Sequence, residues 1–291
     1  MIKLIAMDMD GTLLTQNNEI LPKTKEVLMA LQRKGIRLVL ASGRSYSRLM
    51  KHALELEMDR YGGYLVEING SAIYDVQQGK RERLSQMEVP QIHELFHYFM
   101  KWNVEILSHL DDGMYDYMSE AIYQEKAEYR KVHNLPDDFP WTPGPFELLY
   151  DNRQGYPRHF HIQTPEEIQE CANKISVTYH EDVIAEVMEQ ARKDLKGRYW
   201  VGLTTPRWIE VMPLGVSKAH GLKIVGERLG IKAEEMMAFG DGENDMEMIA
   251  FVGIGVAMKN AFAGLKEIAK EVCESNEEEG VAKTLQRHFD L

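Results

Sequence analysis

The stretch Lys3-Leu-Ile-Ala-Met-Asp-Met-Asp-Gly-Thr-Leu-Leu14 carries the strongest indication of the fold. Leu4 to Met7 is a short apolar run, which is typical of a strand buried on both faces within a parallel sheet. The run ends at Asp8 and Asp10, and Gly11 then permits a sharp turn. Two carboxylates at the end of a buried strand are costly unless a cation pairs with them. Mg2+ is the natural cation, because it prefers carboxylate oxygens.

Composition and charge exclude several classes of protein. The chain has 291 residues and a formal net charge of −12, so we expect two domains or one large one, and no nucleic-acid partner. Cys171 and Cys273 lie far apart and in no C-x-x-C spacing, which argues against a disulfide framework or a zinc site. No apolar run reaches membrane-spanning length, and the first one meets Asp8 too soon for a signal peptide. We therefore expect a cytoplasmic protein with no membrane partner.

Buried apolar runs alternate with helix-like segments towards both ends of the chain. The expected strands are Ile36 to Ala41, Tyr64 to Val66, Met236 to Phe239 and Gly253 to Ala257. Strands that alternate with helices imply right-handed crossovers. The pattern predicts an α/β fold with a doubly wound parallel sheet that helices cover on both faces.

The sequence changes character between residues 85 and 210. Short strand pairs occur here among helices, including an expected helix at Pro165 to Ile175. Leu135 to Phe146 carries four prolines and is expected to be largely loop. We expect an α+β domain of residues 85–210 that is inserted into a core of residues 1–84 and 211–291.

Polar residues follow three of the expected strands, and the carboxyl ends of parallel strands meet at one edge of a sheet. Three groups can therefore converge although they are distant in the sequence: Asp8 with Asp10, Ser42 with Gly43, and the run from Asp241 to Asp245. Asp241 could complete the cation site, and Asp245 could orient the ligands without itself binding the cation.

Other residues at this edge are suited to bind phosphate. The Asn244 amide, the Ser42 hydroxyl and the Gly43 N–H are donors of the kind that phosphate oxygens need. Lys218 begins an expected helix and could place an ammonium over the same edge. Each feature has a plainer reading when taken alone, as a turn, a solvated lysine or an acidic loop. The run Gly240-Asp-Gly-Glu-Asn-Asp245 lacks the ligand spacing of an EF-hand.

Four short motifs, taken in order, resemble those of haloacid-dehalogenase-superfamily phosphatases. They are D-M-D-G-T-L at Asp8 to Leu13, A-S-G-R at Ala41 to Arg44, G-V-S-K at Gly215 to Lys218, and G-D-G-E-N-D at Gly240 to Asp245. The inserted segment and N-G-S-A-I-Y-D at Asn69 to Asp75 resemble the Cof-type subfamily, which has a large α/β cap of the C2B kind. Met7 and Met9 stand where this family more often has Phe or Leu.

The resemblance implies a mechanism. Asp8 would be the nucleophile that forms an aspartyl-phosphate, and Asp10 would act as general acid and then as general base. The Asp10 carboxyl must begin protonated, so we expect surroundings that favour this form. Mg2+ would be held by the Asp8 side chain, the Asp10 carbonyl and Asp241, and Lys218 would offset the repulsion between carboxylate and phosphate.

The resemblance also implies the surroundings of the phosphate. The Met9 N–H, Ser42, Gly43 and Asn244 would hold its remaining oxygens. Thr12 would help to orient Asp10. The cap would close over the leaving group and exclude water.

Three functions follow from these features. The first is a Mg2+-dependent phosphomonoesterase that acts on a small phosphorylated metabolite such as a sugar phosphate. The second is a phosphomutase, which returns the phosphoryl group to its sugar. The third is a regulator that binds a phosphorylated metabolite without turnover, although the complete set of carboxylates speaks against it. We expect a monomer or a weak homo-oligomer.

Two further groups of residues could take part in function, but each has a plainer explanation. His159 and His161 share one face of an expected strand and could bind a metal, although packing or surface roles are commoner for such pairs. Trp102, Tyr115 and Tyr117 could stack on a substrate, but we expect them to pack within the inserted domain.

Overall fold

The computed structural model describes residues 1–134 and 158–290. The chain divides into two compact units, one of Met1–Leu84 with Gly215–Leu291 and one of Ser85–Leu214. The boundary that the sequence places between residues 210 and 211 falls inside strand β11, Trp208–Pro213. The expected loop at Leu135 to Phe146 lies outside the described residues.

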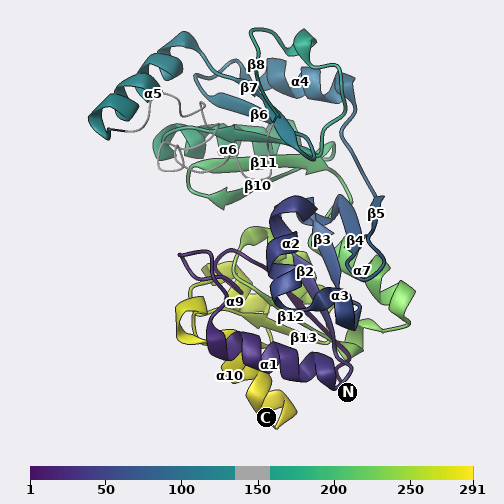
Figure 1. Cartoon of the computed structure of the whole chain (residues 1–291). Helices are drawn as coiled ribbons and strands as arrows, with labels where there is room; N and C mark the ends of the chain where they lie inside the picture. The colour runs from purple at the N-terminus through teal and green to yellow at the C-terminus, as the bar shows by residue number, and fades with distance from the viewer. Residues whose placement is uncertain (135–157, 291) are drawn as a thin grey trace. The chain divides into compact units, whose positions relative to one another are not determined.

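The first unit is built on an eight-stranded sheet in the order β14-β13-β12-β1-β2-β3-β4-β5 (Figure 1). The six strands from β14 to β3 are parallel, and β4 and β5 continue the sheet as antiparallel strands. The strands are β1 (Leu4–Met7), β2 (Arg37–Ala41), β3 (Tyr64–Glu67), β4 (Ala72–Asp75), β5 (Lys80–Arg83), β12 (Met236–Gly240), β13 (Ile254–Ala257) and β14 (Glu271–Val272).

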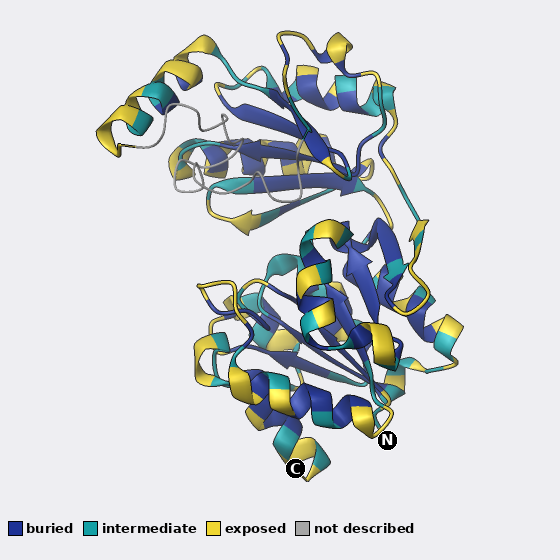
Figure 2. Cartoon of the chain, viewed as in Figure 1, coloured by how far each residue is buried: buried dark blue, intermediate teal, exposed yellow. Residues whose placement is uncertain are grey.

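Helices cover this sheet, as the alternating pattern predicts. They are α1 (Pro22–Arg33), α2 (Tyr46–Glu55), α3 (Met58–Tyr61), α7 (Lys218–Leu229), α8 (Met246–Phe251), α9 (Ala263–Ile268) and α10 (Gly280–Phe289). Helix α1 packs against α10, and α7 packs against α8. Strands β1 and β12 are fully buried, while the helices turn exposed residues outwards (Figure 2). The predicted α/β class with a parallel sheet is confirmed.

The second unit has its own six-stranded sheet, in the order β10-β11-β9-β6-β7-β8. Its strands are β6 (Glu105–His109), β7 (Gly113–Tyr117), β8 (Arg158–His161), β9 (Lys174–Thr178), β10 (Tyr199–Thr205) and β11 (Trp208–Pro213). All neighbours are antiparallel except β7 and β8. Residues of α4 (Val89–Phe99) and α6 (Glu181–Asp194) bury their apolar faces in one core with this sheet, and α5 spans Glu120–Val132.

One expected helix of the second unit is wrong. Pro165 to Ile175 contains only a single 3₁₀ turn, Pro165–Glu167, and Ile175 belongs to β9. Tertiary pairing outweighs the helical spacing here, because Ala172 exchanges two main-chain hydrogen bonds with Met87 and β9 lies between β6 and β11.

Among the described residues, no helix combines the length and the apolar character that a bilayer crossing requires.

Candidate active site

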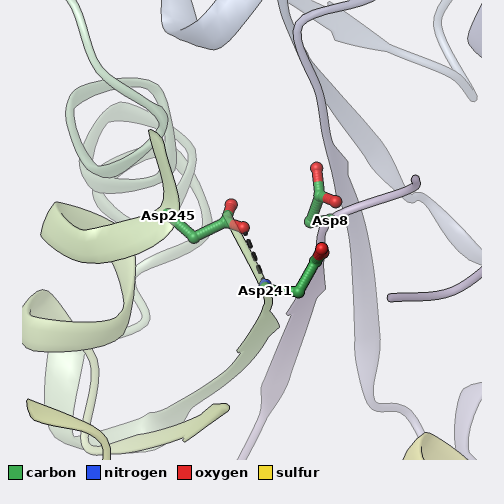
Figure 3. A group of neighbouring side chains, drawn as sticks. All are labelled: Asp8, Asp241 and Asp245. Atoms are coloured by element: carbon green, nitrogen blue, oxygen red, sulfur yellow. Dashed lines mark hydrogen bonds between the residues drawn. The ribbon is translucent and has the colours of Figure 1, made fainter. Parts of the chain in front are cut away.

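The carboxyl ends of three neighbouring strands bring together residues that are distant in the sequence. Strand β1 lies between β12 and β2, and the chain leaves these strands at Asp8, Asp241 and Ser42. Asp8, Asp241 and Asp245 each offer a carboxylate oxygen, and these atoms lie within 4.8 Å of one another (Figure 3). The predicted convergence of Asp8 with the run from Asp241 to Asp245 is therefore present.

Lys218 is fully buried between two of these carboxylates. Its Nζ lies 2.5 Å from Asp8 Oδ1 and 2.7 Å from Asp245 Oδ1. It is the first residue of α7, and the Ser217 side chain caps this helix by accepting a hydrogen bond from the His220 N–H. The cap and the helix start place the ammonium beside Asp8, as the sequence predicts.

Asp245 supports the loop that carries Asp241. Its Oδ2 accepts hydrogen bonds of 3.0 Å from the main-chain N–H groups of Asp241 and Gly242 (the bond to Asp241 is dashed in Figure 3). Because Oδ1 meets Lys218, the buried carboxylate links the loop after β12 to the start of α7. This agrees with the orienting role that the sequence suggests for Asp245.

Thr12 differs from expectation. Its hydroxyl donates a 2.7 Å hydrogen bond to Asp241 Oδ1 and so supports this carboxylate, whereas the resemblance implies that Thr12 helps to orient Asp10. Gly11 precedes it with φ of +80°, and a Cβ at this position would collide with the Asp241 carboxylate. The turn after β1 is therefore shaped to lie directly against Asp241.

The Asp10 carboxyl also differs from expectation. It forms a two-pronged ion pair with Arg44, in which Nε donates to Oδ2 over 2.8 Å and Nη2 donates to Oδ1. The Asp10 side chain is 63% exposed. We expected surroundings that favour the protonated acid, but a guanidinium fork is the partner of an ionised carboxylate.

The expected phosphate donors lie on adjoining loops. Met9 and Ser42 are buried, and Ser42 Oγ accepts a 3.1 Å hydrogen bond from the Arg44 N–H. Gly43 lies between Ser42 and Arg44, at the end of β2. The Asn244 amide Nδ2 donates to Asn69 Oδ1 at 2.9 Å. The sequence predicts no role for Asn69, although this residue belongs to the N-G-S-A-I-Y-D motif. Its pairing with Asn244 leaves no local signal in the sequence, because 175 residues separate the two.

A strained turn carries Asn69. Ile68, Asn69 and Gly70 have consecutive φ values of +51°, +52° and +95°. A β-branched residue in this left-handed region is a true outlier, and such residues cost about 1–3 kcal/mol each. The turn is kept in place by hydrogen bonds from Ile68 N–H to the Arg44 carbonyl and from Asn69 N–H to the Ser42 carbonyl.

Burial and mutual repulsion shape the charges of the site. Burial raises the pKa of Asp8 well above its ordinary value; Lys218 opposes this rise, and Asp245 and Asp241 add to it. Burial and the charge of Asp245 raise the pKa of Asp241 to about 6. The pKa of Lys218 is raised, because Asp245 and Asp8 together outweigh its burial. Three carboxylates beside one ammonium leave a surplus of negative charge, and the all-oxygen donor set fits Mg2+.

The two histidines do not join a comparable group. Within the described part of the chain, Asp8, Asp241 and Asp245 form the one group of three potential ligands close enough to hold a metal. His161 instead pairs with Asp116, with 3.0 Å between Nδ1 and Oδ2.

The three aromatic residues pack as expected. Tyr115 belongs to the core of the second unit, and Trp102 and Tyr117 pack against this core.

Comparisons with known proteins place the whole chain in one family. The family model of the haloacid dehalogenase-like hydrolases matches residues 5–285. The HMP-PP phosphatase of Serratia proteamaculans is 29% identical over 291 residues, which cover 98% of this chain and 95% of the relative. The 5-amino-6-(5-phospho-D-ribitylamino)uracil phosphatase YcsE of Bacillus subtilis is 29% identical over 290 residues, which cover 100% of this chain and 96% of the relative. A crystal structure of a haloacid dehalogenase-like hydrolase from Bacteroides thetaiotaomicron aligns with a TM-score of 0.77 and 28% identity, covering 99% of this chain and 100% of that one.

The family match spans almost the whole chain, and these relatives and this structure align from end to end. The resemblance to haloacid-dehalogenase-superfamily phosphatases that the four motifs indicate is therefore confirmed, as is the Cof-type resemblance of the inserted segment and of Asn69 to Asp75. The chain belongs to the haloacid dehalogenase-like hydrolases and is an enzyme of the phosphatase type.

Proposed function

We propose that the protein is a Mg2+-dependent phosphomonoesterase that hydrolyses a small phosphorylated metabolite through an aspartyl-phosphate. The observation that carries this proposal is the buried contact of Asp8 with Lys218 beside Asp241 and Asp245. The core, residues 1–84 and 215–291, would carry the chemistry. Residues 85–214 would form the cap that determines which leaving group is accepted.

In the first step, an Asp8 carboxylate oxygen attacks phosphorus and the ester P–O bond breaks. Asp10 gives its proton to the departing alkoxide oxygen, so the alcohol leaves neutral. In the second step, Asp10 takes a proton from a water molecule, whose oxygen attacks phosphorus and displaces the Asp8 carboxylate. The products are inorganic phosphate, the alcohol and the free enzyme.

Charge compensation is the main requirement of these steps, because an anionic carboxylate must approach an anionic phosphate. Lys218 supplies one positive charge at Asp8. Asp8, the Asp10 carbonyl and Asp241 would hold Mg2+, which neutralises phosphate charge when bound. Met9 N–H, Ser42, Gly43 and Asn244 would donate to the other phosphate oxygens.

The proposed substrates are a class, the small phosphorylated metabolites, and not one compound. The two relatives at 29% identity are named for HMP-PP and for a phosphorylated ribitylaminouracil, and we retain a sugar phosphate as the first candidate. A panel with Mg2+ should therefore include hexose and pentose phosphates together with these two compounds, compared by kcat/KM. Release of free inorganic phosphate distinguishes hydrolysis from a phosphomutase, which would return the group to its sugar.

The nucleophile is tested with Asp8→Asn, which keeps the size of the side chain and removes the attacking anion. We expect hydrolysis of p-nitrophenyl phosphate to fall by at least about a thousandfold, with an unchanged circular-dichroism spectrum. Asp59→Asn, at an exposed position of the same unit, serves as the control with normal turnover. Undiminished hydrolysis by the folded Asp8 variant would refute the assignment.

A further inference from the structure

Asn69 lies where three candidate phosphate-binding segments meet. Its Oδ1 accepts a 2.9 Å hydrogen bond from Asn244 Nδ2, and its main-chain N–H donates to the Ser42 carbonyl at 2.8 Å. The Ser42 N–H in turn donates to the Val66 carbonyl, so the loop after β2 is bonded to β3 and its turn from both sides. Asn69 is 1% exposed, so these bonds are shielded from solvent.

The same turn is pressed against the start of α7. A Cβ at Gly70 would overlap the Ser217 carbonyl and lie 3.4 Å from the Lys218 N–H nitrogen. One turn further along the helix, a Cβ at Gly221 would lie 3.4 Å from the Gly70 Cα. At Gly70 only a residue without a side chain permits this approach, so the turn and the first residues of α7 are in direct contact.

We propose that Asn69 is a positioning residue for phosphate, and that it acts by orienting the amide of Asn244. The Asn244 Nδ2 carries two hydrogens. Asn69 Oδ1 accepts one of them, which prevents rotation of the amide and directs the second hydrogen at the phosphate. The inference rests on the proposed function, in which Asn244 donates to a phosphate oxygen.

A purely structural role makes a different prediction. If Asn69 served only to close its turn, its loss would lower stability and would affect phosphate binding with or without Asn244. If it acts through Asn244, its effect on phosphate binding must disappear once the Asn244 amide is removed. A double-mutant cycle separates these possibilities, because residues that act through one another are not additive.

The variant that suits this backbone is Asn69→Gly, because glycine adopts a φ of +52° without strain. Asn18→Gly is its matched control: Asn18 also has a left-handed backbone, with φ of +60°, and is an exposed residue of the same unit. Both changes add the same freedom to the unfolded chain. They differ in that only Asn69 contacts Asn244.

The probe is inorganic phosphate, titrated calorimetrically into the full-length protein with Mg2+, together with KM and kcat for p-nitrophenyl phosphate. We expect Asn69→Gly to raise the Kd for phosphate and KM by about tenfold or more, since hydrogen bonds to charged groups have such effects. The kcat should change much less, and Asn18→Gly should change none of these values. In an Asn244→Ala background, Asn69→Gly should add less than about a twofold change.

Independent, multiplying effects of the two substitutions would overturn the inference, as would an unchanged phosphate Kd in Asn69→Gly or a loss of its folding. The proposed function is judged separately by Asp8→Asn. If that variant still turned over substrate, the assignment of Asp8 as nucleophile would be wrong. The phosphate titration would still test whether Asn69 affects the Kd for phosphate.

Discussion

Lys218 Nζ and Asp8 Oδ1 lie 2.5 Å apart at a place that solvent hardly reaches. Asp245 takes a second hydrogen bond from the same ammonium. A buried charge is costly unless an opposite charge pairs with it, so the ammonium and the two carboxylates stabilise one another in their charged forms. The interaction that would prepare the nucleophile for phosphate therefore also holds the first turn of α7 against the end of β1.

This double role gives a prediction for Lys218→Met, which keeps the length of the side chain and removes the charge. Two buried carboxylates then lose their partner, and we expect the first unit to lose about 3–5 kcal/mol of stability along with all measurable turnover. Urea denaturation in EDTA measures the loss. Lys23→Met is the control, because the exposed ion pair of Lys23 with Glu26 should contribute at most about 1 kcal/mol. Equal effects of the two substitutions would contradict the importance of burial.

Gly11 and Gly35 allow backbone strain to be separated from damage to the carboxylate cluster. Both have φ near +80° to +90°, but only a Cβ at Gly11 would meet another group within 4 Å, the Asp241 carboxylate. We expect both Gly11→Ala and Gly35→Ala to lower stability by about 1 kcal/mol or more, with the larger loss in Gly11→Ala because the Asp241 carboxylate must also move. Only Gly11→Ala should weaken Mg2+ binding, by at least about tenfold, as measured by calorimetric titration. If Gly11→Ala bound Mg2+ with the affinity of the wild type, Asp241 would not be a ligand of the cation.

The parts of this site that could be predicted from sequence are those with a local signature. Asp8 follows a buried apolar run, Asp241 follows another, and Lys218 begins a helix after a capping serine. The rule that parallel strands end at one edge then brings these residues together without any coordinates. The strand order β12-β1-β2 provides this arrangement.

The partners of these residues could not be predicted, because they depend on which side chains meet across distant loops. Thr12 bonds Asp241 across 229 positions of sequence and Asn244 bonds Asn69 across 175, and neither pairing leaves a periodic or compositional signal. The expected helix at Pro165 to Ile175 failed for the same reason. Its apolar spacing is helical, but the main-chain pairing of Ala172 with Met87 and of Ile175 within β9 determines the conformation of its second half.

The raised pKa of Asp241, about 6, predicts how the metal-free protein responds to pH. In the unfolded chain this carboxyl titrates near its ordinary value of about 3.9, so the folded state binds the proton more tightly. The resulting contribution to stability is complete below pH of about 4 and is lost as pH rises through about 6. In EDTA, the wild type should therefore lose stability between pH 5 and 7.5 more steeply than Asp241→Asn. Mg2+ should reverse the wild-type loss at pH 7.5 and have little effect on the variant; parallel pH profiles would contradict the raised pKa.

Asp245→Asn tests whether the loop after β12 depends on a carboxylate or only on the shape of the side chain. The carboxylate accepts from the Asp241 and Gly242 N–H groups with one oxygen and from Lys218 with the other. An amide has a single oxygen, so its NH₂ group must face either the two N–H donors or the ammonium, and one side loses its acceptor. We expect a loss of about 1–3 kcal/mol in urea denaturation, together with weaker Mg2+ binding because Asp241 is no longer held. Asp194→Asn, at a surface carboxylate bonded to Gln190 and Tyr98, should change neither quantity. An Asp245→Asn protein with wild-type stability and Mg2+ affinity would mean that Thr12 and Gly11 suffice to orient Asp241.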